Sequence, residues 1–136
     1  MSASKAKKAR VLIVEDETET RDMLALLLEM SGYEVLKAEH ALAAVCAIVR
    51  SAPDLIVADI RMPVMDGFAL VRELKSNIDS AHIPVVAVTG LDSAEYRKEA
   101  AQAGCAAFFS KPIDASTFPK QLGEIIKQNK ASLATK

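Results

Sequence analysis

The sequence lacks long apolar segments, internal repeats and low-complexity stretches. No apolar run approaches the length of about 18 residues that a membrane-spanning helix needs. The run from Val11 to Val14 is also too short for the core of a secretion signal. These absences argue against a membrane-spanning, secreted or repeat protein, and we expect a cytoplasmic globular domain.

Cysteine is scarce. The two cysteines, Cys46 and Cys105, show neither the spacing of a CxxC pair nor that of a metal-ligand set. We therefore expect both thiols to be reduced and to pack among apolar neighbours. A GxGxxG motif is missing as well, which argues against a dinucleotide-binding site.

Charge of either sign is not in large excess, since the formal net charge is −1. However, four basic residues lie within the first ten positions, and the remaining chain carries 13 positive and 18 negative charges. Such an acidic body repels nucleic acid, so no nucleic-acid partner is expected. We expect residues 1–9 to form a disordered basic tail, residues 10–128 one domain, and residues 129–136 a polar tail.

Short apolar runs alternate along the chain with segments whose apolar residues recur at helical spacing. Strands are predicted at residues 10–15, 33–38, 55–59, 83–88 and 106–110, and helices at residues 18–30, 41–49, 67–75 and 116–127. A further helix, capped by Asp92 or Ser93, is predicted to run through Ala103 and to stop at Gly104. The segment 41–49 is nearly all apolar and fits a buried helix or a strand, but its alanines favour the helix. Pro119 has no amide hydrogen, so it is placed in the first turn of the last helix.

This alternation predicts an α/β fold, in which helices cover both faces of a five-stranded parallel sheet. Right-handed crossovers leave few strand orders, and one of them is 2-1-3-4-5. In that order the ends of the first and third strands are neighbours. Ligand chemistry in such sheets lies beyond the carboxyl ends of the strands.

Four of the predicted strands end on polar groups, which are Glu15 with Asp16, Asp59, Thr89 and Lys111. Taken singly, these residues suit ordinary roles such as helix cap, turn residue or surface lysine. Parallel strands, however, bring all of these ends to one edge of the sheet. The coincidence predicts a functional site, in which three carboxylates would raise one another's pKa unless a cation neutralised them.

The motifs VLIVEDE, DLIVADIRMPVMDG, VVAVTG and FFSKP occur in this order. Through them the sequence resembles the receiver domain of two-component response regulators, over about residues 10–127. The resemblance implies the doubly wound, flavodoxin-like (βα)5 fold with strand order 2-1-3-4-5. It also implies a cis peptide between Lys111 and Pro112.

The resemblance further implies a chemistry, in which Asp59 accepts a phosphoryl group from phosphohistidine. Lys111 and Thr89 would assist the transfer, and Thr89 with Phe108 would form a switch. An Mg²⁺ ion would be bound by Asp16, Asp59, the backbone carbonyl of Arg61 and, through water, Glu15. Mg²⁺ suits such a set because it prefers oxygen ligands.

The partners that the resemblance implies are a histidine kinase or histidine phosphotransfer protein upstream and a protein target downstream. The target would bind the surface formed by the fourth helix, fifth strand and fifth helix. The main alternative is a pseudo-receiver that docks partners without phosphorylation. Two further alternatives fit poorly, because Glu15 to Glu17 would repel a flavin phosphate, and Arg61 stands where an aspartyl phosphohydrolase has a second aspartate.

Overall fold

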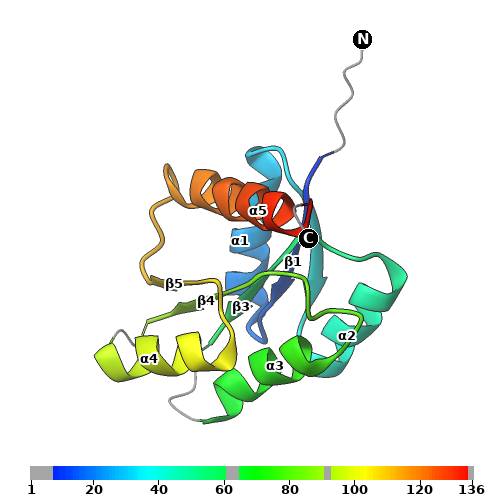
Figure 1. The fold of residues 1–136 in the computed structure, drawn as a ribbon. Helices are drawn as coiled ribbons and strands as arrows, with labels where there is room; N and C mark the ends of the chain where they lie inside the picture. The colour runs from blue at the N-terminus through cyan, green and yellow to red at the C-terminus, as the bar shows by residue number, and fades with distance from the viewer. Residues whose placement is uncertain (1–7, 61–64, 91–92, 135–136) are drawn as a thin grey trace.

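The computed structural model describes residues 8–60, 65–90 and 93–134 of the chain. Strands and helices alternate throughout (Figure 1). They are β1 (Arg10–Val14), α1 (Thr18–Met30), β2 (Glu34–Ala38), α2 (Ala41–Arg50), β3 (Leu55–Asp59), α3 (Met65–Ser76), β4 (Val85–Thr89), α4 (Ala94–Ala103), β5 (Ala107–Ser110) and α5 (Phe118–Ala134). Within the described residues, no helix combines the length and apolar character needed to cross a bilayer.

The five strands form one parallel sheet in the order β2-β1-β3-β4-β5, which confirms the predicted topology. Its register places Val14 beside Ala58, Asp59 beside Val88 and Thr89 beside Ser110. The carboxyl ends of β1, β3, β4 and β5 therefore meet along one edge of the sheet.

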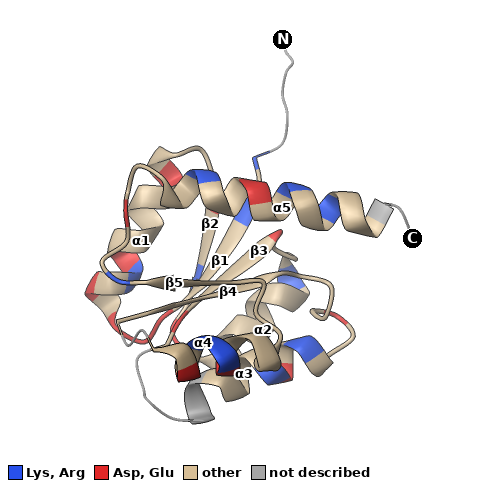
Figure 2. Cartoon of the chain, turned by 60° about the vertical axis from the view of Figure 1, so that its left-hand side comes forward, with Lys and Arg blue, Asp and Glu red and all other residues tan. Residues whose placement is uncertain are grey.

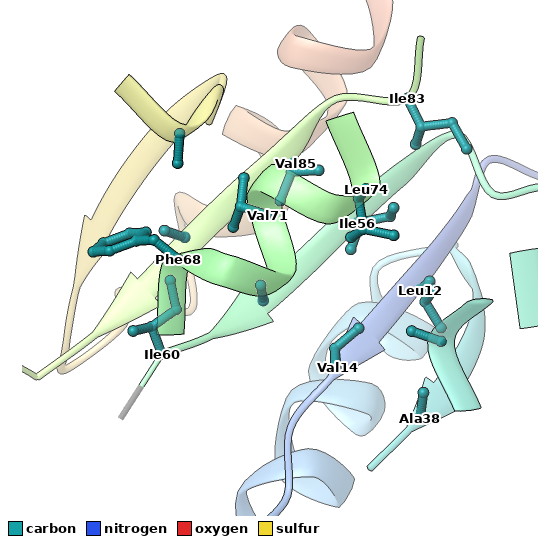
Figure 3. Close-up of a cluster of buried hydrophobic side chains, with 14 of the residues drawn as sticks. Leu12, Val14, Ala38, Ile56, Ile60, Phe68, Val71, Leu74, Ile83 and Val85 are labelled. Carbon is teal, nitrogen blue, oxygen red and sulfur yellow. The ribbon is translucent and has the colours of Figure 1, made fainter. Parts of the chain in front are cut away.

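Helices cover both faces of the sheet, with α1 and α5 on one side and α2, α3 and α4 on the other (Figures 1 and 2). Successive residues of a strand point to opposite faces. Val11 and Ile13 accordingly pack in the cluster with α1 and α5. Leu12 and Val14 pack in the other cluster, with α2, α3 and α4, which Figure 3 shows. Burial on both faces explains why these strands read as unbroken apolar runs.

Local signals set the ends of α4. The Ser93 hydroxyl accepts a hydrogen bond from the Tyr96 amide at 3.1 Å, so Ser93 is the N-cap. Gly104 ends the helix with φ of 109°, a left-handed conformation that favours glycine. A Cβ atom at Gly104 would also lie 2.9 Å from Cγ of Lys75, so α3 and α4 approach closely at this position.

The segment 41–49 is helical, as its alanines predicted, and Pro119 lies in the first turn of α5. Other expectations were wrong. Helix α3 begins at Met65 rather than Gly67, β4 spans Val85–Thr89 rather than residues 83–88, and Cys46 is exposed rather than packed.

Helix α5, expected to end at about Lys127, continues to Ala134. Two contacts to the protein body hold its last turns. Asn129 Nδ2 donates to the His82 carbonyl at 3.1 Å, and Lys130 Nζ lies 3.5 Å from Asp54 Oδ1. Residues 1–7 of the expected basic tail lie outside the described part of the chain.

Two tyrosines of the fold provide a stability test. The Tyr96 ring packs edge-on against Phe68 from α3, with centroids 6.2 Å apart. Its hydroxyl is buried without a hydrogen-bond partner among the described residues, and such a group costs about 1–3 kcal/mol. We expect Tyr96→Phe to raise the free energy of unfolding by about 1 kcal/mol.

Urea denaturation measures this effect, and Tyr33→Phe is the matched control. The Tyr33 hydroxyl donates to the Pro119 carbonyl at 2.6 Å, so its removal should lower the free energy of unfolding by about 1 kcal/mol. A loss of stability in Tyr96→Phe would contradict the prediction.

Candidate functional site

The candidate site lies at the carboxyl edge of the sheet. Asp59 is the last residue of β3 and Thr89 the last residue of β4, while Glu15 and Lys111 directly follow β1 and β5. The structure therefore brings together the strand-end residues that the sequence predicted for this edge. Glu15, Asp59 and Thr89 are fixed by the ends of buried strands, and Lys111 by the half-buried β5, which gives the site a rigid base.

An ion pair between Asp59 and Lys111 forms the centre of the site. Lys111 Nζ lies 2.8 Å from Asp59 Oδ2, and the side chains are 33% and 0% exposed, respectively. The Lys111 amide donates to the Thr89 carbonyl at 2.9 Å, which joins the residue after β5 to the end of β4. The peptide between Lys111 and Pro112 is cis, as expected.

The Asp59 carboxylate is short of hydrogen-bond donors. Both of its oxygens are buried. Apart from the Lys111 ammonium and the neighbouring Glu15 carboxyl, no described residue serves them as a partner. A buried carboxylate in this state retains lone pairs that can coordinate a cation or attack an electrophile.

Glu15 is the buried acid beside Asp59, and its side chain is only 1% exposed. Burial, followed by the hydrogen bond and negative charge of Asp59, raises the pKa of Glu15 to about 8. The Glu17 amide donates to Glu15 Oε2 at 2.7 Å, which partly opposes this rise. At neutral pH, without a cation, Glu15 therefore holds a proton beside the Asp59 carboxylate.

Asp16 is exposed at the rim of the site, where it also interacts with the Glu15 carboxyl. Arg61, whose carbonyl was predicted as a metal ligand, lies outside the described residues. Across the described chain, no three acidic, histidine or cysteine side chains form a ready-made metal cluster.

This donor set nevertheless fits Mg²⁺. Mg²⁺ is commonly held by one or two carboxylates while it keeps several water ligands, so a complete protein cage is not required. A cation would also offset the charge that raises the pKa of Glu15. Asp59, Asp16 and Glu15 are the described side chains that could hold it, directly or through water.

Thr89 and Phe108 share the face of the sheet covered by α3 and α4. Phe108 pairs with Ala87, two residues before Thr89, so the alternation of β4 and β5 puts both side chains on that face. Thr89 is fully buried, whereas Phe108 is half-buried. The predicted switch residues are therefore near neighbours on adjacent strands.

Sequence reasoning missed Arg97, whose guanidinium carbon lies 4.8 Å from the centroid of the Phe108 ring. A signal was present in the helical spacing. Arg97 precedes Ala100 by three positions, and Ala100 is buried against the sheet, so Arg97 had to border the buried face of its helix.

Comparison with known proteins agrees with this geometry. Residues 11–123 match the family described as the response regulator receiver domain. The polar-differentiation response regulator DivK of Brucella anthropi is 36% identical over 108 residues, which are 79% of this chain and 88% of DivK. Protein PilH of Pseudomonas aeruginosa is 32% identical over 118 residues, which cover 87% of this chain and 98% of PilH.

Other similar proteins are longer. The chain spans only 23% of the response regulator PleD of Caulobacter vibrioides, to which it is 39% identical over 106 residues.

Among solved structures, the chemotaxis protein CheY4 of Vibrio cholerae aligns with a TM-score of 0.79 at 29% identity, over 88% of this chain and 99% of CheY4. The fold, the strand-end residues and these similarities together assign the chain to the receiver domain family of response regulators.

Proposed function

We propose that this chain is a phosphoacceptor that takes a phosphoryl group from phosphohistidine onto Asp59. The donor is a histidine kinase or a histidine phosphotransfer protein, and the setting is the cytoplasm. The observation that carries the proposal is the fully buried Asp59 carboxylate, whose Oδ2 lies 2.8 Å from the Lys111 ammonium. That pair places a nucleophile beside a cation able to stabilise phosphoryl charge.

Transfer forms one bond and breaks another. An Asp59 carboxylate oxygen bonds to phosphorus, while the bond between phosphorus and the histidine nitrogen breaks and its electron pair returns to that nitrogen. Charge develops on the phosphoryl oxygens during this in-line displacement, so positioning and electrostatics provide most of the catalysis. Among the described residues, Lys111 places its ammonium group in contact with the reacting Asp59 carboxylate, where it can stabilise that charge.

The remaining site residues would orient the phosphoryl group and neutralise its charge. Mg²⁺, when bound, would neutralise charge on the phosphoryl oxygens and on the acidic pocket. Asp16, Asp59 and the Arg61 carbonyl would be its ligands, and Glu15 would act through water. The Thr89 hydroxyl, at the end of β4, would donate to a phosphoryl oxygen.

An apolar stripe on α1 is suited to the upstream partner. Met23, Leu26 and Met30 are exposed and recur at helical spacing. Helix α1 begins directly after the acidic loop of the site, so a helix docked on this stripe could present its phosphohistidine to Asp59. Exposed apolar surface next to a reactive site commonly marks a protein interface.

The output surface would be α4, β5 and α5. Phe108 packs against the core cluster that includes residues of α4, and Thr89 lies on the same face of the sheet, two positions further along the neighbouring strand. A phosphoryl group that draws the Thr89 hydroxyl would therefore change the space open to Phe108. The downstream target would bind differently to the α4, β5 and α5 surface once Phe108 has moved.

Incubation with acetyl phosphate and Mg²⁺ tests the proposed function. We expect intact-protein mass spectrometry to show addition of one phosphoryl group, which EDTA prevents and mild base removes. A purified histidine kinase loaded with labelled phosphate should transfer its label to the chain. No uptake from either donor would favour the pseudo-receiver alternative.

A further inference from the structure

Arg97 and Phe108 form a contact that links α4 to β5. The guanidinium carbon of Arg97 lies 4.8 Å from the centroid of the Phe108 ring, within the range of about 6 Å in which a cation is attracted to an aromatic face. Arg97 is exposed and Phe108 half-buried. The contact therefore covers a switch ring at the protein surface.

The position of Arg97 in its helix favours a specific role for this contact. Arg97 is the fourth residue after the N-cap Ser93. A cation near a helix N-terminus is disfavoured by the helix dipole. The attraction to the Phe108 ring is one interaction that opposes this cost.

The adjacent residue makes a contact in a different direction. Tyr96 packs edge-on against Phe68 of α3, with an interplanar angle of 83°, while Arg97 packs on Phe108 of β5. One turn of α4 thus joins the helix to both of its neighbours. A change in the orientation of the Phe108 ring would therefore alter a direct contact of α4.

We propose that Arg97 is a positioning residue that holds the Phe108 ring at the surface when Asp59 is not phosphorylated. Phe108 lacks a hydroxyl, so no hydrogen bond from this ring can fix its orientation. The stacked guanidinium supplies that restraint instead. Movement of the ring toward Thr89 would break the stack, because a guanidinium cannot follow into the core without a large desolvation cost.

The inference rests on the proposed function and predicts a measurable coupling. A contact made only in the resting state stabilises that state by some factor. It must lower, by the same factor, the apparent affinity of any ligand that favours the other state. An exposed cation–π contact corresponds to about a two- to five-fold effect on an equilibrium. Removal of the Arg97 charge should therefore tighten phosphoryl-analogue binding by about two- to five-fold.

The test compares Arg97→Met, which keeps an apolar stem and loses the charge, with Arg97→Lys, which keeps a cation. Lys98→Met is the matched control, because Lys98 is the next residue of α4, is exposed, and stacks on no ring in the described chain. The probe is beryllium fluoride with Mg²⁺, an analogue of the phosphoryl group. Its apparent Kd is measured by NMR titration.

We expect Arg97→Met to lower the apparent Kd by about two- to five-fold, Lys98→Met to leave it unchanged, and Arg97→Lys to lie near the wild type. In a Phe108→Leu background, Arg97→Met should have no effect, because the ring is gone. Equal Kd values for Arg97→Met and wild type, or the same shift in Lys98→Met, would overturn the inference.

A second readout needs no phosphoryl analogue. Ring signals of ¹³C-labelled phenylalanine, assigned to Phe108 through Phe108→Leu, should shift in unliganded Arg97→Met and stay in place in Lys98→Met. Unchanged Phe108 signals in Arg97→Met would also overturn the inference. If wild type binds no beryllium fluoride, the proposed function fails while this readout still decides the role of Arg97.

Discussion

Asp59→Asn is expected to abolish phosphoryl uptake, with a loss of at least about 100-fold to the background of the assay. An amide is not a nucleophile toward phosphorus, and Asp59 is the acid whose carboxylate lies against the Lys111 ammonium. The measurement is incorporation of label from acetyl phosphate or a phosphorylated kinase in the presence of Mg²⁺. The variant should fold, because asparagine has nearly the same volume and removes a buried charge.

Asp54→Asn is the matched control for this experiment. Asp54 immediately precedes the same strand at its opposite end, where it accepts a hydrogen bond from the Arg10 amide at 2.8 Å and lies near Lys130. This substitution changes an aspartate at the other end of β3 and leaves the phosphoacceptor site unaltered. Phosphoryl uptake should therefore persist at the wild-type rate. Full labelling of Asp59→Asn at the same position of the chain would contradict the assignment of the phosphoacceptor.

The stability of the metal-free protein is expected to fall as pH rises from about 4.5 to 8, and Glu15 is the cause. Its pKa is about 8 in the folded state against an ordinary 4.5, so within this window the folded protein holds a proton that the unfolded chain has released. Stability then decreases with rising pH. At 1.36 kcal/mol per pKa unit, the loss amounts to about 4 kcal/mol.

Glu15→Gln isolates this contribution, because glutamine cannot ionise. In EDTA the variant and wild type should have similar stability near pH 4.5, and the variant should exceed wild type by about 4 kcal/mol at pH 8. Urea denaturation across the pH range gives the difference. Glu19→Gln, an exposed acid in the first turn of α1, should follow the wild-type profile.

Mg²⁺ should restore much of the stability lost by wild type at pH 8, because a ligand that binds only the folded state stabilises it. The same addition should help Glu15→Gln less, since part of the repulsion that the cation offsets is already gone. Parallel pH profiles for wild type and Glu15→Gln in EDTA would show that Glu15 is not the group responsible.

Prediction from sequence succeeded where the signal was local. The runs Val11 to Val14 and Leu55 to Ala58 are fully or almost fully buried strands, because a strand covered on both faces must be apolar at every position. Ser93 and Gly104 mark the ends of α4 through their own backbone chemistry. The strand order implied by the resemblance to receiver domains then placed the acid of β3 beside the end of β1, and the observed sheet has this order.

Prediction failed where distant segments decide the outcome. Residues 129–134 were expected to lie in a polar tail, yet they are helical, with Asn129 bonded to His82 and Lys130 paired with Asp54. Cys46 lies in an apolar helix but on its outer side. A local sequence pattern cannot predict which distant residues a side chain will contact or which side of a helix will be exposed. Both depend on the segments that pack against the helix.

The site divides along the same line. The sequence predicted which residues stand at the carboxyl edge, since right-handed crossovers leave few strand orders and the resemblance to receiver domains selects 2-1-3-4-5 among them. Only the tertiary structure decided that Lys111 Nζ lies 2.8 Å from Asp59, that the pKa of Glu15 rises to about 8, and that Arg97 covers Phe108. Distances, burial and stacking depend on how side chains from separate elements pack, and packing is a property of the whole fold.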